Sequence, residues 1–242
     1  MNQFRKAEVM MKVNDIREHF IHMLEDEQYT KDRTGQKTIE MIGASFLADQ
    51  ESIFGEPNKE YIDAELNWYK YGSLNINDIY FDKKEPPMAW QMSANDRGDI
   101  NSNYGHLIEA DKYHGQYYQV LDELLRDYNT RRAIMIYNRP SIWVEAFEHG
   151  KNDFICTNAV TYYIRDGAIH AVVQMRSNDV VFGYKNDYAW QLHVLKRLVD
   201  DYNFCYLDKA HDADYRKQMD VGNIIWQVQN LHVYERHFHL VK

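Results

Sequence analysis

The sequence predicts an α+β fold, with a mixed or mostly antiparallel β-sheet, flanking helices and a single domain. Strand-like runs joined by a tight-turn signal alternate with segments of helical spacing, and this mixture is typical of the α+β class. The 242 residues are 45% hydrophobic and include only four prolines, which suits one well-packed core. We therefore expect one domain over residues 1–242.

Four segments carry apolar residues at helical spacing. We expect an amphipathic helix capped by Asn14, a second over residues 59–71, a third over 114–128 and a fourth over 188–202. Glu65 lies beside the apolar face of the second helix, where a carboxylate usually faces solvent.

Strands are expected in five places, namely over residues 38–46, 133–137, 154–163, 168–175 and 222–234. Asp166-Gly167 stands between the third and the fourth strand, and this pair is a strong signal for a tight hairpin. Residues 72–103 are polar and irregular, so we expect loops able to line a cleft. The charged segment 208–220 is expected to be a surface loop.

Polar residues crowd the stretch from Gln174 to Trp190, which leaves an apolar strand, turns around Gly183 and enters a helix. These polar residues predict a site at the end of the strand. Its candidate charged and hydroxyl side chains are those of Arg176, Ser177, Asp179 and Asp187. The hairpin brings Cys156 beside Arg176, and a neighbouring cation lowers the pKa of a thiol. A buried, unreactive cysteine is the commoner alternative.

Arginines and a histidine–tyrosine pair supply further candidates. Arg131 and Arg132 begin a strand, where they fit either a phosphate clamp or a pair of surface charges. Arg33 lies in a polar loop and is either solvated or a ligand. His232 and Tyr234 project from one strand face, where they would grip a hydroxyl or simply pack.

Charge and composition exclude several functions. A net charge of -9 disfavours binding to polymeric nucleic acid but leaves single nucleotides open. Two cysteines give no disulfide framework, no leader opens the chain, and no apolar run is long enough for a membrane span, so we expect a cytoplasmic protein. We find no Cys/His spacing for a metal and no Gly-rich turn for a dinucleotide or P-loop site.

Short motifs along the chain share residue type, order and spacing with one enzyme family. They are Lys37-Thr38-Ile39-Glu40, Glu65-Leu66, Asn101-Ser102-Asn103-Tyr104-Gly105, Arg131-Arg132, Cys156, Arg176-Ser177-Asn178-Asp179 and His232-Val233-Tyr234. Over nearly its whole length the sequence resembles the thymidylate synthase family. Met175, Cys156-Thr157-Asn158 and Asp187 resemble the phage branch that acts on dCMP, because synthases place Gln, Cys-His and Asn there.

The resemblance implies a thymidylate synthase-like fold and a pyrimidine nucleotide hydroxymethyltransferase. Such an enzyme moves a one-carbon unit from 5,10-methylenetetrahydrofolate to carbon 5 of dCMP, adds water and uses no metal. A methylase of dUMP or dCMP, or a nucleotide-binding protein without turnover, remains as an alternative. The resemblance also implies a homodimer in the cytoplasm, the host's for a viral protein, with DNA modification as its context.

Site roles follow from the resemblance position by position. Cys156 matches the nucleophile, Glu65 the carboxylate that organises water, and Tyr104 the tyrosine involved in proton removal from carbon 5. The matches for substrate binding are Arg33, Arg176 and Ser177 for phosphate, Arg131 and Arg132 for phosphate in the partner's site, and His232 and Tyr234 for the sugar hydroxyl. Trp90 and Asp179 match contacts to the folate.

Asp187 is the candidate for reading the base. Cytosine offers an amino donor at position 4 and an acceptor at position 3, which an acid can complement, whereas the Asn of synthases suits uracil. A helix-start Asp acting only as a cap is the alternative. Family members generally continue into a tail that closes over the folate, whereas this sequence ends at Lys242, so we expect weaker closure.

Overall fold

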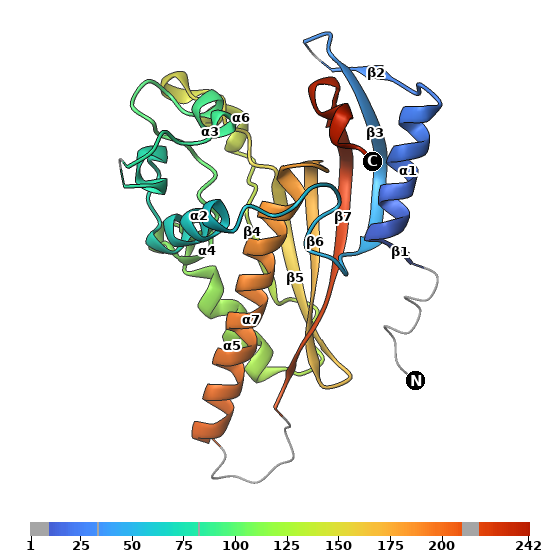
Figure 1. The fold of residues 1–242 in the computed structure, drawn as a ribbon. Helices are drawn as coiled ribbons and strands as arrows, with labels where there is room; N and C mark the ends of the chain where they lie inside the picture. Colours follow the sequence, from blue (N-terminus) through green and yellow to red (C-terminus); the bar gives the residue numbers. More distant parts are fainter. Residues whose placement is uncertain (1–9, 33, 82, 210–217) are drawn as a thin grey trace.

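One mixed sheet forms the centre of the protein in a computed structural model that describes residues 10–32, 34–81, 83–209 and 218–242. Its strand order is β1-β3-β7-β6-β5-β4, with β2 paired to β3 (Figure 1). The β1–β3 and β6–β7 pairs are parallel and the others are antiparallel. The strands are β1 (Met11–Lys12), β2 (Thr30–Lys31), β3 (Lys37–Leu47), β4 (Ile134–Ile136), β5 (Thr157–Arg165), β6 (Ala168–Asp179) and β7 (Asp220–Tyr234).

Helices flank this sheet, as the sequence predicts. The long helix α7 packs on β6 and on α5, while α1 packs against β3, near the edge of the sheet formed by β1 (Figure 1). The α-helices are α1 (Val13–Glu25), α2 (Lys59–Tyr71), α3 (Met88–Ser93), α4 (Tyr104–Glu109), α5 (Gln116–Arg126), α6 (Ile142–Glu145) and α7 (Gly183–Lys209). The 3-10 helices are η2 (Ile76–Ile79), η3 (Asp111–Tyr113), η4 (Glu148–Gly150) and η5 (Glu235–Leu240).

The β5–β6 hairpin confirms the turn prediction. Asp166 and Gly167 both have positive φ, 52° and 80°, which suits the tight hairpin turn that Asp-Gly favours. Pairing then runs from Arg165↔Ala168 up to Thr157↔Met175. This register fixes which residues of the two strands meet at the far end of the hairpin.

Helix boundaries differ from the prediction in three places. Helix α1 begins at Val13 with Lys12 as N-cap, so Asn14 lies inside the helix and is not the cap. Helix α5 is shorter at both ends than predicted. Helix α7 begins at Gly183, five residues before the predicted start at Tyr188, because Asp179 Oδ1 accepts the backbone N–H groups of Val181 (2.9 Å) and Phe182 (2.6 Å) in the turn before it.

Two predicted loop regions have different outcomes. Residues 72–103 are largely irregular but contain η2 and α3. Most of the predicted surface loop over 208–220 lies outside the described residues, and α7 and β7 occupy its two described ends. Within the described residues, no helix is both long enough and apolar enough to cross a membrane.

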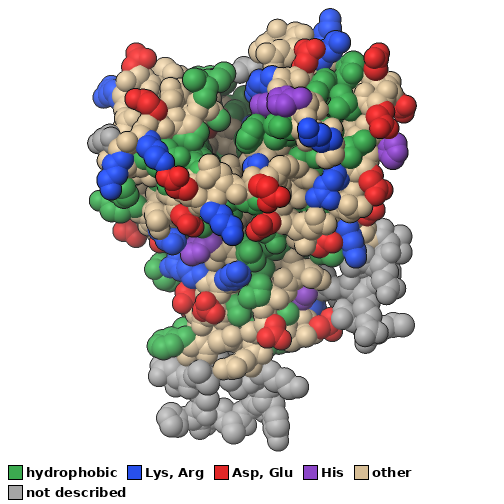
Figure 2. All heavy atoms as spheres, in the orientation of Figure 1, with side chains coloured by type: hydrophobic (Ala, Val, Ile, Leu, Met, Phe, Trp, Pro, Cys, Tyr) green, Lys and Arg blue, Asp and Glu red, His purple; other side chains and the backbone are tan. Residues whose placement is uncertain are grey.

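The elements that carry the candidate residues converge at one end of the sheet. β5 begins there, β6 and β7 end there, and α7 starts there, because β5 is antiparallel to β6 while β6 is parallel to β7 (Figure 1). Figure 2 shows a hollow at this end, between the part built by α2, α3 and α6 and the part built by β3 and η5.

Candidate active site

A thiol and a guanidinium meet where the hairpin strands open. Arg176 Nη2 lies 3.6 Å from Cys156 Sγ, and the backbone N–H of Arg176 donates to the Cys156 carbonyl (2.8 Å). Arg176 Nη2 also donates to the Phe154 carbonyl (3.1 Å), and its guanidinium lies over the Phe154 ring. The predicted proximity of Cys156 and Arg176 is therefore confirmed.

The net effect on the thiol differs from the expectation. Burial raises the pKa of Cys156 to about 11, and the positive charge of Arg176 only partly offsets this effect. Negative charge on Asp187 and Asp153 adds to the increase. In the free protein the thiol is thus protonated at neutral pH, and it needs a further change in its surroundings to react as a thiolate.

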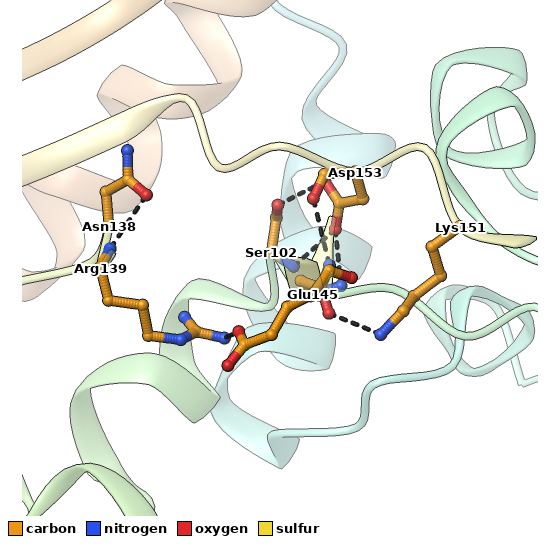
Figure 3. Close-up of polar contacts among 7 residues, drawn as sticks. Ser102, Asn138, Arg139, Glu145, Lys151 and Asp153 are labelled. Carbon is orange, nitrogen blue, oxygen red and sulfur yellow. Dashed lines mark hydrogen bonds and ion pairs between the residues drawn. The ribbon is translucent and has the colours of Figure 1, made fainter. Parts of the chain in front are cut away.

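A carboxylate clamp fixes the loop before Cys156 (Figure 3). Asp153 is 6% exposed, and its Oδ2 accepts the backbone N–H groups of Asn101 (2.6 Å) and Ser102 (2.8 Å). Its Oδ1 accepts from Ser102 Oγ (2.5 Å). The clamp ties this loop to the segment that leads into α4, so it sets where the thiol stands.

The same network continues to α6. Asn101 Nδ2 donates to the Glu145 carbonyl (3.0 Å), and Lys151 Nζ donates to Asn101 Oδ1 (2.7 Å). The Glu145 carboxylate pairs with Arg139 (Figure 3). These contacts join three loops around the nucleophile, and the sequence offered no short motif that marked them.

Asp187 lies on the first turns of α7, facing this region. Its Oδ2 accepts from Asn178 Nδ2 (2.7 Å). Burial and the charge of Glu65 raise the pKa of Asp187 to about 8, although the Asn178 amide and the Tyr104 hydroxyl act to lower it. Asp187 is therefore largely protonated at neutral pH, so it can both donate and accept a hydrogen bond.

Glu65 is buried, so the expectation that it faces solvent is wrong. It is 5% exposed, and its Oε1 accepts from the Tyr61 hydroxyl and from Trp90 Nε1 (3.0 Å). Burial raises the pKa of Glu65 to about 7, and these two hydrogen bonds act to lower it. A carboxyl group that titrates near neutral pH is suited to moving protons.

Tyr104 stands at the start of α4, with its ring stacked on Tyr69 at 5.4 Å between centroids. Burial raises the pKa of Tyr104 well above its ordinary value, and the negative charges of Asp187 and Cys156 add to this. The phenol therefore keeps its proton at neutral pH. Its electrostatic coupling to both groups places it with Cys156 and Asp187 in one site.

The ends of β6 and β7 lie side by side. Asp179 pairs with His232 in the sheet register and Ser177 pairs with Asn230, while the rings of His232 and Tyr234 lie edge to face at 4.8 Å. Burial lowers the pKa of His232 even though Asp179 opposes the effect, so the imidazole is neutral at pH 7. A neutral imidazole can share a hydrogen bond with a hydroxyl.

Asp179 has an unused acceptor. Its Oδ1 caps the turn before α7, but its Oδ2 is buried without a hydrogen-bond partner among the described residues, and His237 Nδ1 is 3.9 Å away. Burial opposes ionisation, yet His237 and the Phe182 N–H hold the pKa of Asp179 below its ordinary value. An ionised acceptor of this kind fits a ligand that offers N–H groups.

Arg131 and Arg132 are not at the thiol. Arg131 and Arg132 are exposed, and Arg132 Nε pairs with Glu123 Oε1 at 3.1 Å. The next strand, β4, pairs Ile134 with Thr161, several residues along β5 from Cys156, so these arginines lie away from the thiol. Arg33 lies outside the described residues.

Sequence reasoning overlooked three contributors. Asn178 was only a member of a motif, and neither Tyr61 nor Asp153 was singled out. The four-residue spacing of Tyr61 and Glu65 on one helix was a usable signal, whereas the partners of Asp153 come from about fifty residues away. The described residues hold no group of three or more His, Cys, Asp or Glu side chains able to bind a metal ion.

The fold and the site define a class. Residues 16–242 match the family model "Thymidylate synthase", and the chain belongs to the thymidylate synthase family. Its fold is that of the crystal structure of thymidylate synthase from T4 phage, with a TM-score of 0.68 and 20% identity over 91% of this chain and 77% of that one.

More similar relatives narrow the class. The deoxycytidylate 5-hydroxymethyltransferases of Enterobacteria phages T4 and T6 are each 50% identical to this chain over 231 residues, which is 96% of this chain and 89% of theirs. The predicted family is thus confirmed, and these relatives carry the activity that the sequence analysis expected.

Proposed function

We propose that this protein is a deoxycytidylate 5-hydroxymethyltransferase that converts dCMP to 5-hydroxymethyl-dCMP with 5,10-methylenetetrahydrofolate as the one-carbon donor. The single observation that carries this proposal is the half-buried carboxyl group of Asp187, which lies in one site with the Cys156 thiol and whose pKa is raised to about 8. A synthase for dUMP has a neutral amide at this position. The identity to relatives with the same activity supports the proposal.

Cys156 loses its thiol proton to solvent when substrate is bound, and its sulfur adds to carbon 6 of the cytosine ring, which pushes electron density to carbon 5 and makes that carbon nucleophilic. Asp187 complements the base: the carboxylic acid donates to ring nitrogen 3 and accepts from the 4-amino group. A proton shared between Asp187 and ring nitrogen 3 also favours addition of the thiol, because it withdraws electrons from the ring. The high pKa of the thiol in the free protein fits a nucleophile activated only with substrate bound.

Glu65 and Tyr104 manage protons and water. Tyr104 takes part in removing the proton from carbon 5, through a water molecule. Glu65 takes and returns protons near neutral pH, as its pKa of about 7 allows. Once the bond between the transferred carbon and the folate nitrogen has broken and tetrahydrofolate has left, water that Glu65 orients would add to the methylene carbon attached at carbon 5, and the Cys156 sulfur would then leave carbon 6 as a thiolate. This addition, in place of reduction, gives the hydroxymethyl group.

The donor folate supplies the one-carbon unit when it is bound. Trp90 has a partly buried indole, whose N–H donates to the Tyr61 hydroxyl (2.9 Å) and to Glu65 Oε1 (3.0 Å). A ligand that packs on Trp90 therefore contacts a residue that holds Glu65 in place. The unpartnered Asp179 Oδ2 is free to accept from N–H groups of the folate ring. The residues present therefore fit this co-substrate.

Substrate anchoring is proposed for the remaining candidates. Arg176 and Ser177, together with Arg33, bind the phosphate, and His232 and Tyr234 hold the sugar hydroxyl. Each of the described members lies at the end of β6 or β7, and Arg176 among them contacts Cys156. We also propose that residues 1–242 form one catalytic domain and that the protein works in the cytoplasm, where its free cysteines stay reduced.

A homodimer is part of the proposal, with Arg131 and Arg132 completing the phosphate site of the partner. Their exposed position away from their own thiol supports this arrangement. Mixing inactive Arg132→Ala protein with inactive Cys156→Ser protein should restore part of the activity, since one site in the mixed dimer has both an intact clamp and an intact thiol. No recovery after demonstrated subunit exchange would contradict it.

Product mass tests the proposed activity. Incubation of dCMP with methylenetetrahydrofolate should add the mass of a hydroxymethyl group to the nucleotide without forming dihydrofolate. Cys156→Ser should abolish the product while dCMP still binds, and Cys205→Ser, the matched control, should be nearly silent. A methylated product together with dihydrofolate would indicate a synthase, and no product from the unaltered protein would indicate a binding protein.

A further inference from the structure

A chain of hydrogen bonds behind Asp187 determines which of its two oxygens can carry a proton. The chain runs from Trp226 in β7 through Asn178 in β6 to Asp187 in α7. Its consequence for substrate choice rests on the proposed function, in which Asp187 faces the base.

The direction of these bonds is fixed by chemistry. Trp226 Nε1 lies 3.2 Å from Asn178 Oδ1, and an indole N–H can only donate, so the amide oxygen of Asn178 must face Trp226. The Asn178 NH₂ group then points the other way and donates to Asp187 Oδ2 (2.7 Å). Reversing the amide would set two donors against each other at Trp226.

Packing holds this orientation. Asn178 is 4% exposed and Trp226 is fully buried, with the Trp226 ring edge to face against Tyr184 at 5.2 Å. Gly183 closes the other side: a Cβ at this position would stand 3.1 Å from Asn178 Nδ2. The amide therefore sits in a close-fitting space that leaves little room for another rotamer.

A protonated Asp187 consequently has unequal oxygens, because the Asn178 NH₂ group can only donate to Oδ2, whereas the Tyr104 hydroxyl, the other hydrogen-bond partner of Asp187, can either donate or accept. Oδ2 receives the Asn178 N–H, and a proton placed on Oδ2 would weaken it as an acceptor for that bond. The acid proton is therefore favoured on Oδ1, while Oδ2 keeps a lone pair for a second donor. The raised pKa of Asp187, about 8, keeps the group in this acid form at neutral pH.

We propose that Asn178 is a positioning residue for base selection, which fixes Oδ1 of Asp187 as the donor to ring nitrogen 3 and Oδ2 as the acceptor from the 4-amino group of cytosine. A carboxylic acid whose oxygens exchange these roles would also suit uracil, with an acceptor for the ring N–H and a donor to the 4-oxygen. Asn178 disfavours that exchange. An acid at position 187 alone would discriminate less between the two bases.

Two variants of the chain test this role. Asn178→Leu removes the donor to Asp187 at similar volume, and Trp226→Phe keeps Asn178 but removes the group that orients its amide. We expect the ratio of dissociation constants for dUMP and dCMP, measured by calorimetry, to fall about tenfold or more in Asn178→Leu and less in Trp226→Phe. Asn203→Leu is the control, because the Asn203 amide bonds the Met219 backbone away from the site and its loss should leave the ratio unchanged.

A double variant separates selection from general damage. In an Asp187→Asn background, Asn178→Leu should cause little additional change in the ratio, because the protonated oxygen on which it acts is gone. An unchanged ratio in folded Asn178→Leu protein, or in Trp226→Phe protein if the first variant does not fold, would overturn the proposal. The proposed catalytic function fails separately, if the unaltered protein binds dCMP selectively but forms no hydroxymethyl product.

Discussion

Two aspartates near the nucleophile, the buried Asp153 and the half-buried Asp187, show how similar side chains are used differently. Burial raises the pKa of both carboxyl groups. Asp153 accepts three hydrogen bonds from Asn101 and Ser102, two of them from backbone N–H groups. Asp187, in contrast, is held by two side chains, the Asn178 amide on Oδ2 and the Tyr104 hydroxyl.

The contrast lies in how far the chain satisfies each group. A buried carboxylate whose oxygens are filled by backbone donors fixes structure, because removing it leaves those donors unpaired. A carboxyl group that only side chains hold, and whose pKa is raised, can instead exchange a partner for a ligand that matches its protonated form. We therefore expect changes at Asp153 to act on stability and changes at Asp187 to act on substrate choice.

The largest effect should come from Asp187→Asn. An amide donates to the 4-oxygen of uracil and accepts from its ring N–H, whereas it mismatches cytosine at both positions. Two reversed contacts at about 1–3 kcal/mol each would change the ratio of kcat/KM for dCMP and dUMP by on the order of a hundredfold or more. Thermal unfolding should change little. An unaltered ratio in a folded variant that still binds phosphate would show that Asp187 does not read the base.

Asp153→Ala should show the opposite pattern. This substitution leaves the backbone N–H groups of Asn101 and Ser102 without their acceptor, so the free energy of unfolding should fall by about 2–4 kcal/mol. The dCMP-to-dUMP ratio of the remaining activity should stay the same. Asp153→Asn keeps one oxygen for the two N–H groups and should cost less in denaturant titrations; equal losses for the two variants would argue against the clamp.

A smaller effect is expected at Glu65, which stands between the two cases because protein donors hold it and it still titrates. Tyr61→Phe removes a hydrogen bond that lowers the pKa of Glu65, so this pKa should rise above about 7. More Glu65 is then protonated at neutral pH, and the acid limb of kcat/KM should move to higher pH with a few-fold loss at pH 7. Tyr80→Phe, whose ring lies 6.5 Å from that of Tyr61, is the control and should leave the profile in place.

Local signals in the sequence predicted much of the fold and part of the site. Asp166-Gly167 specified the hairpin, and the hairpin register was enough to bring Cys156 beside Arg176. The start of α7 was missed because the Asp179 side chain, not the apolar spacing, sets that boundary.

Features that depend on distant partners could not be predicted. Glu65 is buried and accepts a hydrogen bond from Trp90, which comes from a different helix, and the pKa of Cys156 is high because burial outweighs its cationic neighbour. Neither burial nor its electrostatic cost is visible in the local sequence. The Asp153 clamp is hidden for the same reason.

Proton uptake on nucleotide binding tests most directly whether Asp187 reads cytosine. At about pH 9, one unit above its pKa of about 8, Asp187 is mostly ionised in the free protein. Pairing with cytosine requires one proton between the acid and ring nitrogen 3, so dCMP binding should take up close to one proton and weaken about tenfold for each further pH unit. Calorimetry of dCMP binding in buffers of different ionisation enthalpy measures this number. The account predicts nearly one proton for the unaltered protein and none for Asp187→Asn; no uptake by the unaltered protein would contradict it.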